Sequence, residues 1–168
     1  MSIGDETLRQ APSAGARKPV GIRILDARLG RDFPLPAYAT PGAAGLDLRA
    51  MLDEDRVLAP GETLLVPAGF ALEIGDPRLC AQIHPRSGRA TREGLVLANQ
   101  TGIIDSDYQG PVLVPLYNRG PAALTLHVGE RVAQMVFVVV QQVRLTPLNE
   151  PQPPSARGSG GFGSTGND

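Results

Sequence analysis

Short hydrophobic runs recur along most of the chain after residue 20, and turn residues such as Pro60-Gly61 and Gly75-Asp76 separate them. Many short strands with frequent turns, and without a long helical period, predict an all-β sandwich or barrel. One short helix is expected at residues 87–93. The expected strands are Val20–Leu25, Leu46–Leu52, Thr63–Val66, Phe70–Ile74, Leu79–Ile83, Leu95–Ala98, Val112–Tyr117, Leu124–Val128 and Val132–Val143.

The run Val132–Val143 is the most apolar of these strands, and its hydrophobic and polar positions barely alternate. A strand without alternation is typically buried on both faces. Burial between the strand's own core and a neighbouring subunit explains the pattern, and so does a central strand of a monomer. The pattern alone leaves both explanations open.

The two ends of the chain differ in composition from its middle. Residues 1–18 are small, polar and charged, and we expect a flexible tail there. Residues 149–168 are rich in Pro, Gly and Ser with almost no apolar side chains, so we expect them to be disordered unless a ligand binds. The sequence therefore predicts one β domain at residues 19–148, followed by a mobile C-terminal arm.

Bulk properties exclude several classes of protein. The net charge of −1 over 168 residues gives no electrostatic footprint for nucleic-acid binding. The longest apolar run, Met135–Val140, is far shorter than the roughly 20 residues of a membrane helix. Cys80 is the only cysteine and cannot form an internal disulfide, which fits a reducing compartment. We therefore expect a cytoplasmic protein without membrane or nucleic-acid partners.

The stretch Leu95–Leu116 carries the clearest candidate chemistry. Two β-prone runs flank a polar, hairpin-like segment that holds Asp105, Asp107 and Tyr108. An aspartate beside the apolar Ile103 and Ile104 would be partly desolvated, which raises a carboxyl pKa and makes it a better proton acceptor. A surface turn in which aspartate only shapes the backbone explains the same residues.

Two further segments are candidate phosphate sites. Pro85–Gly88 leads from a strand into a helical turn and offers the Arg86 guanidinium and the Ser87 hydroxyl, although an N-cap serine beside a surface arginine is equally consistent. Arg157–Gly166 is a glycine-rich segment around Phe162, and its backbone N–H groups suit phosphates. An ordinary disordered tail is the alternative for the second segment.

The chain resembles the homotrimeric dUTP diphosphatases (dUTPases) in five ordered blocks. Five blocks in this order are a far more specific signal than any one of them. The blocks are AGLDLRA at Ala44–Ala50, PRSG at Pro85–Gly88, NQTGIIDSDYQG at Asn99–Gly110, NRG with GERVAQMVF at Asn118–Gly120 and Gly129–Phe137, and RGSGGFGSTG at Arg157–Gly166.

The resemblance implies a jelly-roll-like β barrel that assembles into a homotrimer, with each site built from three chains. It also implies hydrolysis of dUTP to dUMP and pyrophosphate with Mg²⁺ as cofactor, which lowers dUTP and supplies dUMP for thymidylate synthesis. In this resemblance Asp105 is the base that activates the attacking water. Asp47 then lies near the hydrated Mg²⁺, although a structural hydrogen-bond acceptor is an open alternative for this residue.

The resemblance also implies which residues of this sequence bind the substrate. The Asn99–Ile104 segment would read uracil, Tyr108 would pack on the deoxyribose, and Phe162 would stack on the base. The implied substrate-binding residues are Arg86, Ser87, Gly88, Asn99, Ile103, Ile104, Asp105, Tyr108, Leu113, Gln134, Arg157, Phe162, Gly163, Ser164 and Thr165.

Two alternative functions remain at this point. A dCTP deaminase shares the barrel and the trimer but carries a catalytic glutamate on the strand after the hairpin, whereas Pro111–Tyr117 contains no carboxylate here. A non-catalytic nucleotide-binding regulator could also keep the fold, but Asp105, Arg86, Ser87 and Phe162 argue against lost activity.

Overall fold

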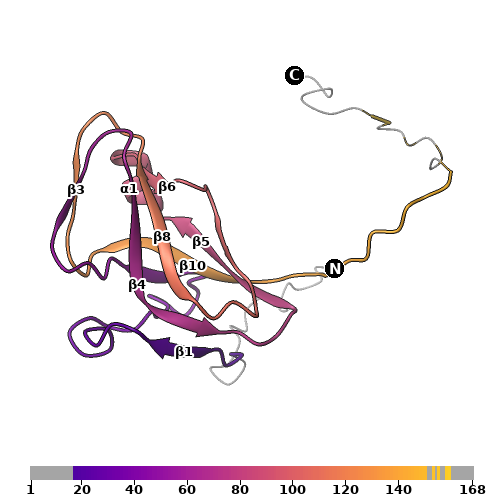
Figure 1. The fold of residues 1–168 in the computed structure, drawn as a ribbon, viewed down its shortest axis with the longest axis horizontal. Coiled ribbons are helices and arrows are strands. Elements are labelled where there is room, and N and C mark those ends of the chain that lie inside the picture. Colours follow the sequence, from indigo (N-terminus) through magenta and orange to yellow (C-terminus); the bar gives the residue numbers. More distant parts are fainter. Residues whose placement is uncertain (1–16, 151–152, 154, 156–157, 160–168) are drawn as a thin grey trace, which may run out of the picture.

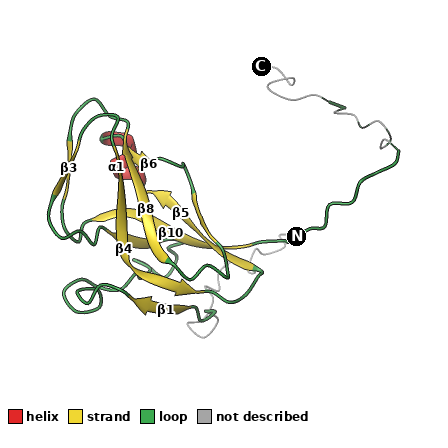
Figure 2. Ribbon diagram, viewed as in Figure 1, coloured by secondary structure: helices red, strands yellow, loops and turns green. Residues whose placement is uncertain are grey.

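A computed structural model describes residues 17–150, 153, 155, 158 and 159 of the chain. The described part is almost entirely β-structure, with one short helix, as Figures 1 and 2 show. The elements are β1 (Gly21–Ile24), β2 (Leu46–Arg49), β3 (Arg56–Leu58), β4 (Thr63–Glu73), β5 (Leu79–Pro85), α1 (Ser87–Arg92), β6 (Leu95–Leu97), β7 (Gly102–Ile104), β8 (Pro111–Asn118), β9 (Leu124–Leu126) and β10 (Arg131–Val139).

Two four-stranded antiparallel sheets enclose the core. One sheet has the strand order β1-β4-β8-β6 and the other β2-β10-β5-β7, and β3 and β9 form a separate pair. Phe70 and Val114 from the first sheet pack with Leu48, Ile83 and Met135 from the second in one buried cluster. The all-β fold predicted from the strand pattern is therefore confirmed, and so is the jelly-roll-like fold that the resemblance implies.

Strand β4 corrects one expected turn. The sequence predicts separate strands at Thr63–Val66 and Phe70–Ile74, because Pro67-Ala68-Gly69 is a typical turn signal. The structure has one strand over Thr63–Glu73, and its pairing with β8 is irregular between Pro67 and Ala71. Gly69 has φ +84°, and a Cβ there would lie 2.8 Å from the Met51 Cγ atom. The turn residues thus form a bulge inside a continuous strand.

The polar segment between β6 and β8 also differs from the expected hairpin. Strands β6 and β8 pair with each other, with Leu97 opposite Leu116. The chain between them crosses to the second sheet, where β7 pairs with β5 and Ile104 lies opposite Ala81. This crossing, which local sequence does not reveal, carries the segment of Asp105 to the open edge of the second sheet.

The predicted helix is confirmed as α1. Arg86 precedes it as an extended N-cap residue, and Glu93 ends it. Ser87 is therefore the first helical residue and not the N-cap that one interpretation of the sequence expected. No helix in the described part of the chain is long and apolar enough to cross a membrane.

Strand β10 ends at Val139, four residues before the expected limit of Val143. Its first half is buried, at Val132, Ala133 and Met135, but Val139 is 82% exposed. Beyond it the chain runs away from the body (Figure 1), and Leu145 is 90% exposed. Val136, Phe137 and Val138 are half-buried between these ends, so the chain itself leaves uncovered only the end of this apolar run.

Candidate active site

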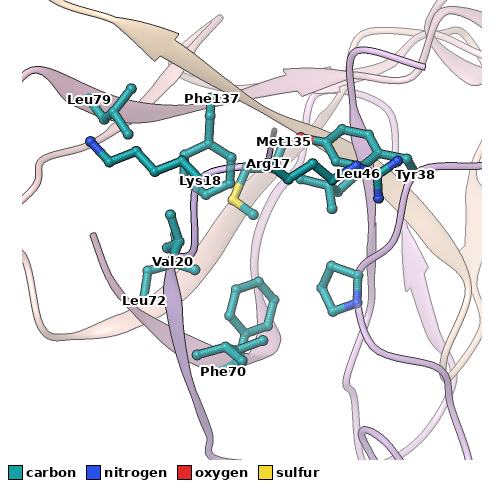
Figure 3. A pocket seen from close by; sticks show the side chains of 12 residues that line it. Arg17, Lys18, Val20, Tyr38, Leu46, Phe70, Leu72, Leu79, Met135 and Phe137 are labelled. Atoms are coloured by element: carbon teal, nitrogen blue, oxygen red, sulfur yellow. The ribbon is translucent and has the colours of Figure 1, made fainter. Parts of the chain in front are cut away.

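An apolar cavity of about 390 Å³ lies between the two sheets, but it contains none of the predicted site residues. Figure 3 shows Phe70, Leu72 and Phe137 lining it, with Arg17 beside the ring of Tyr38 at 5.2 Å. Its walls are mainly hydrocarbon and it lacks the convergent polar groups of a site for a charged ligand. The candidate chemistry lies instead in two other clefts.

The first, which we call the arginine cleft, is lined by charged and small residues from β2 and the loop before it, from α1 and its N-cap residue Arg86, and from β10. Strand β10 pairs with both β2 and β5, so Gln134 lies opposite Asp47 on one side and His84 on the other. This pairing brings together residues far apart in sequence. The cleft is lined by Ala39, Ala43, Ala44, Gly45, Asp47, Arg86, Ser87, Gly88, Arg89, Arg92, Arg131 and Gln134.

Two arginines share one carboxylate in this cleft. The Arg86 Nε lies 3.0 Å from Asp47 Oδ1, and the Arg131 Nη1 lies 3.1 Å from Asp47 Oδ2. The Asp47 side chain is 26% exposed. One carboxylate between two guanidinium groups leaves a net positive charge, so the cleft favours an anionic ligand. Asp47 therefore has the structural role that the sequence left open, and it also faces the cleft.

The start of α1 adds hydrogen-bond donors to the same place. Arg86 makes no side-chain cap, and Ser87 is exposed. The first N–H groups of a helix have no partner within it. The Gln134 side-chain amide donates to the Pro85 carbonyl at 3.0 Å, so β10 is hydrogen-bonded to the residue just before Arg86. Arg86, Ser87, Gly88 and Gln134, four of the expected substrate-binding residues, thus line one cleft.

The second cleft, which we call the aspartate cleft, surrounds the turn that follows β7. Gln82, Ile103, Asp105 and Tyr108 line it, together with Val140 beyond the end of β10. Ile104 is buried in the core instead. Asp105 is exposed, so its own chain does not desolvate it, contrary to the expectation from its apolar neighbours. Covering this carboxylate requires a ligand or another chain.

Backbone carbonyls hold the turn of Asp105 in place. The Ser106 carbonyl accepts the N–H of Gly75 at 3.0 Å, and the Gln109 carbonyl accepts the Arg23 guanidinium at 2.8 Å. The Tyr108 N–H donates to the Asp105 carbonyl at 3.2 Å. The carboxylate itself is not used in these bonds and is free to act on a ligand.

Tyr108 is placed by the glycine two residues later. A side chain at Gly110 would overlap the tyrosine ring, and the Tyr108 hydroxyl donates to the Pro111 carbonyl at 3.2 Å. The ring remains 42% exposed at the cleft. Glycine at 110 therefore lets the tyrosine ring lie against the backbone while the side chain stays partly exposed.

The two clefts lie at opposite ends of β5. Ile104 of β7 lies opposite Ala81 of β5, and the strands are antiparallel, so Asp105 lies beside Cys80 near the start of β5. Arg86 directly follows the last residue of β5. From Cys80 to Arg86, at about 3.3 Å per residue, the separation is roughly 20 Å. A general base acts within about 3 Å of its target or through one water. One chain therefore does not bring Asp105 and Arg86 onto the same phosphates.

Comparison with known proteins matches the part of the chain that forms both clefts to one protein family. The family model dUTPase matches residues 31–166, which include every element that lines the arginine cleft and the turn of Asp105. The chain belongs to the dUTPase family. It is 60% identical over 147 residues to the deoxyuridine 5'-triphosphate nucleotidohydrolase of Methylococcus capsulatus, covering 88% of this chain and 97% of that protein. A second such protein, from Shewanella amazonensis, is 53% identical over 150 residues, covering 89% and 98%.

Solved dUTPase structures share the fold. The dUTPase of Staphylococcus bacteriophage 80alpha with dUpNHpp has a TM-score of 0.76 at 23% identity, covering 89% of this chain and 99% of that chain. The dUTPase mutant of phage phi11 of S. aureus, described with a structural Mg(II) ion, has a TM-score of 0.69 at 20% identity, covering 81% of this chain and all of that one.

The residues of this dUTPase chain fit a magnesium ion that arrives with a polyphosphate. Mg²⁺ is usually held by one or two carboxylates, waters and substrate phosphates. Asp47 offers one carboxylate in a cleft that favours phosphate, and no cluster of three or more acidic, His or Cys side chains forms a ready cage among the described residues. The donor set therefore suits a water-mediated contact from Asp47.

Several predicted residues lie elsewhere. Asn99 is exposed, and neither it nor Leu113 on β8 is part of the lining of the two clefts. The predicted arm residues Arg157, Phe162, Gly163, Ser164 and Thr165 lie outside the described residues.

Sequence reasoning missed two arginines that support the clefts. Arg131 shares Asp47 with Arg86, and Arg23 on β1 binds the carbonyl of Gln109. Arg131 lies in the block Gly129–Phe137 that resembles the family, so the resemblance included this residue but did not predict its ion pair with Asp47. No local signal marks Arg23, because its partner lies 86 residues away.

Proposed function

We propose that this protein hydrolyses dUTP to dUMP and pyrophosphate. Membership of the dUTPase family, over a match that includes both clefts, is the observation that carries the proposal. Its high-identity relatives are named deoxyuridine 5'-triphosphate nucleotidohydrolase. The reaction removes dUTP and provides dUMP for thymidylate synthesis.

Asp105 is the proposed general base. Phosphoryl-group chemistry offers the protein little covalent work, so positioning and charge stabilisation dominate. The free carboxylate of Asp105 accepts a proton from a water that attacks the α-phosphorus, and the bond to the bridging oxygen breaks to release pyrophosphate. Arg86 and Arg131 stabilise the negative charge that grows on the leaving group. Asp47 would hold, through water, a Mg²⁺ ion that arrives with the triphosphate, and that ion would supply further positive charge there.

Specificity is proposed to come from the segment before and after Asp105. The backbone of the Asn99–Ile104 segment, with the side chain of Asn99, pairs with uracil and leaves no room for the thymine methyl group. Tyr108 packs against the deoxyribose and excludes a 2′-hydroxyl. Leu113 supplies a further backbone contact by resemblance.

The protein is proposed to act as a homotrimer with shared sites. The roughly 20 Å between Asp105 and Arg86 in one chain supports a site that takes each of them from a different copy. The exposed apolar residues Val139 and Leu145 support an assembly that covers them. Light scattering at micromolar concentration tests the assembly, and a monomer mass would remove the shared-site model.

The chain is proposed to divide into a tail (1–18), a β domain (19–148) and a C-terminal arm (149–168). The arm would close over the nucleotide, with Phe162 stacking on the base and Arg157, Gly163, Ser164 and Thr165 binding phosphates. Closure of this kind excludes water and matters most in the transition state. Deleting residues 151–168 should leave a folded trimer whose kcat falls by orders of magnitude. Full activity of the truncated enzyme would contradict this role.

The decisive experiment measures pyrophosphate release from each deoxynucleoside triphosphate and from UTP. We expect rapid release from dUTP alone. Ammonia release from dCTP would support the deaminase alternative, although β8 has no carboxylate to catalyse it. Binding without turnover of any nucleotide would support the regulatory alternative and overturn the proposal.

A further inference from the structure

Arg92 lies in the last turn of α1, and its guanidinium folds back over Gly88. A Cβ atom built on Gly88 would lie 3.3 Å from Arg92 Nη1 and 3.4 Å from Nη2. Side chains on a helix lean toward its N-terminus, so a residue reaches the position four before it. The guanidinium of Arg92 therefore stands directly beside the Arg86-Ser87-Gly88 turn and lines the arginine cleft.

The neighbouring Arg89 is already used for structure. Its side chain is only 12% exposed, its Nη2 lies 2.7 Å from Glu93 Oε2, and its Nη1 pairs with Glu130. Glu130 also accepts the His127 backbone N–H at 3.1 Å. These bonds fasten α1 to the turn before β10, and they leave Arg89 without spare charge for a ligand.

Arg92 contrasts with Arg89 in both exposure and pairing. It is exposed, and within the described part of the chain its guanidinium forms no ion pair and no hydrogen bond. Arg86 and Arg131 are both partly neutralised by Asp47. Among the arginines that line the cleft, Arg92 is therefore the one whose positive charge no described carboxylate neutralises.

We propose that Arg92 is an additional phosphate-binding residue, which contacts the polyphosphate held at Ser87 and Gly88. The inference rests on the proposed function for the identity of its ligand. A guanidinium offers a planar fork of N–H donors that matches two phosphate oxygens. In the free protein this fork rests over Gly88, and a phosphate at the helix start lies within its reach.

The test compares Arg92→Gln and Arg92→Lys with a matched control, Arg56→Gln. Arg56 is an exposed arginine on β3, lies outside the arginine cleft, and forms no ion pair among the described residues. Titration calorimetry with inorganic pyrophosphate and Mg²⁺ gives the Kd, and steady-state kinetics with dUTP gives KM and kcat. Melting temperature verifies that each variant is folded.

We expect Arg92→Gln to weaken pyrophosphate binding and raise KM by about tenfold, the usual scale for one charged hydrogen-bonding group. The kcat should change little, because the contact exists in both the ground and the transition state. Arg92→Lys should recover part of the loss, since it keeps the charge without the fork. Arg56→Gln should resemble the wild type.

Wild-type Kd and KM in Arg92→Gln would overturn the inference, and so would an equal loss in Arg56→Gln, which would indicate a general effect of net charge. A wild-type protein that fails to hydrolyse dUTP would refute the proposed function separately. In that case a weaker pyrophosphate Kd in Arg92→Gln alone would still support the anion contact.

Discussion

The arginine cleft and the aspartate cleft are held together by different kinds of contact. The arginine cleft is assembled by side chains from separate elements, and two ion pairs to the half-buried Asp47 hold Arg86 and Arg131. The aspartate cleft also takes its lining from several elements, but Asp105 lies on one turn, and donors from Gly75 and Arg23 hold that turn through its backbone carbonyls. Charge organises the first cleft, whereas backbone shape organises the second.

This difference predicts how each cleft responds to substitution. Backbone bonds survive a change of side chain, so replacing Asp105 should alter chemistry without moving the turn. In the arginine cleft a single substitution releases its partners, because each charge holds another. The aspartate turn is thus the place where catalysis and binding can be separated most cleanly.

The largest effect should follow Asp105→Asn. The amide keeps the shape of the side chain but accepts no proton from water, so we expect kcat to fall by at least about 10²–10⁴-fold. Binding of a non-hydrolysable dUTP analogue should stay near the wild-type value. Asp107→Asn, two residues along the same exposed turn, is the matched control and should retain most activity. Near-normal turnover by the Asp105 variant would show that another group is the base.

A smaller effect should follow Tyr108→Ala in the same turn. Tyr108 lies against Gly110 and is 42% exposed, so if it packs on the deoxyribose as proposed, its removal makes room for a 2′-hydroxyl. We expect the ratio of kcat/KM for dUTP over UTP to fall by about tenfold, since specificity is a difference in transition-state binding. Competition assays with both nucleotides measure the ratio. If the ratio is unchanged, discrimination belongs to the backbone of the turn.

The smallest effect should come from an ion pair outside both clefts. The Arg28 side chain donates two hydrogen bonds to Asp26, at 2.6 Å and 3.0 Å, and these bonds lower the pKa of the Asp26 carboxyl below its usual 3.8. Because the folded-state pKa is depressed, the stabilisation is complete above the unfolded-state pKa and is lost as pH falls through the folded-state value.

Asp26→Asn should therefore lower the Tm at pH 7 by roughly 2–4 °C, the shift for about 1 kcal/mol in a domain of this size. The difference from the wild type should shrink as the pH falls below the usual carboxyl pKa. Activity per folded protein should not change, in contrast to both clefts. A Tm difference that persists undiminished into acid would contradict the ion-pair explanation.

The sequence predicted most of the strands and the short helix, because these depend on local hydrophobic runs and turn residues. It missed β3, which pairs with β9, and β7, which pairs with β5 in the other sheet. It also placed a turn at Pro67-Ala68-Gly69, where pairing with β8 extends the strand through a bulge. Long-range pairing overrides local preference at these places.

The candidate site divides along the same line. Block resemblance identified Asp105, Arg86 and Asp47 by residue, but not the ion pairs between Asp47 and the arginines, which join positions 39 and 84 residues apart. Local sequence also did not reveal that Asp105 and Arg86 lie near opposite ends of β5. That separation depends on the register of β7 against β5.

The most direct test of a shared site mixes two inactive variants, Asp105→Asn and Arg86→Ala. Each is prepared alone, and the two are then refolded together so that mixed assemblies form. If each site takes Asp105 from one copy and Arg86 from another, some mixed sites contain both wild-type residues, and dUTP hydrolysis should reappear at a substantial fraction of the wild-type rate. If one chain supplies both residues, every site stays defective, and mixed assemblies without activity would contradict the account.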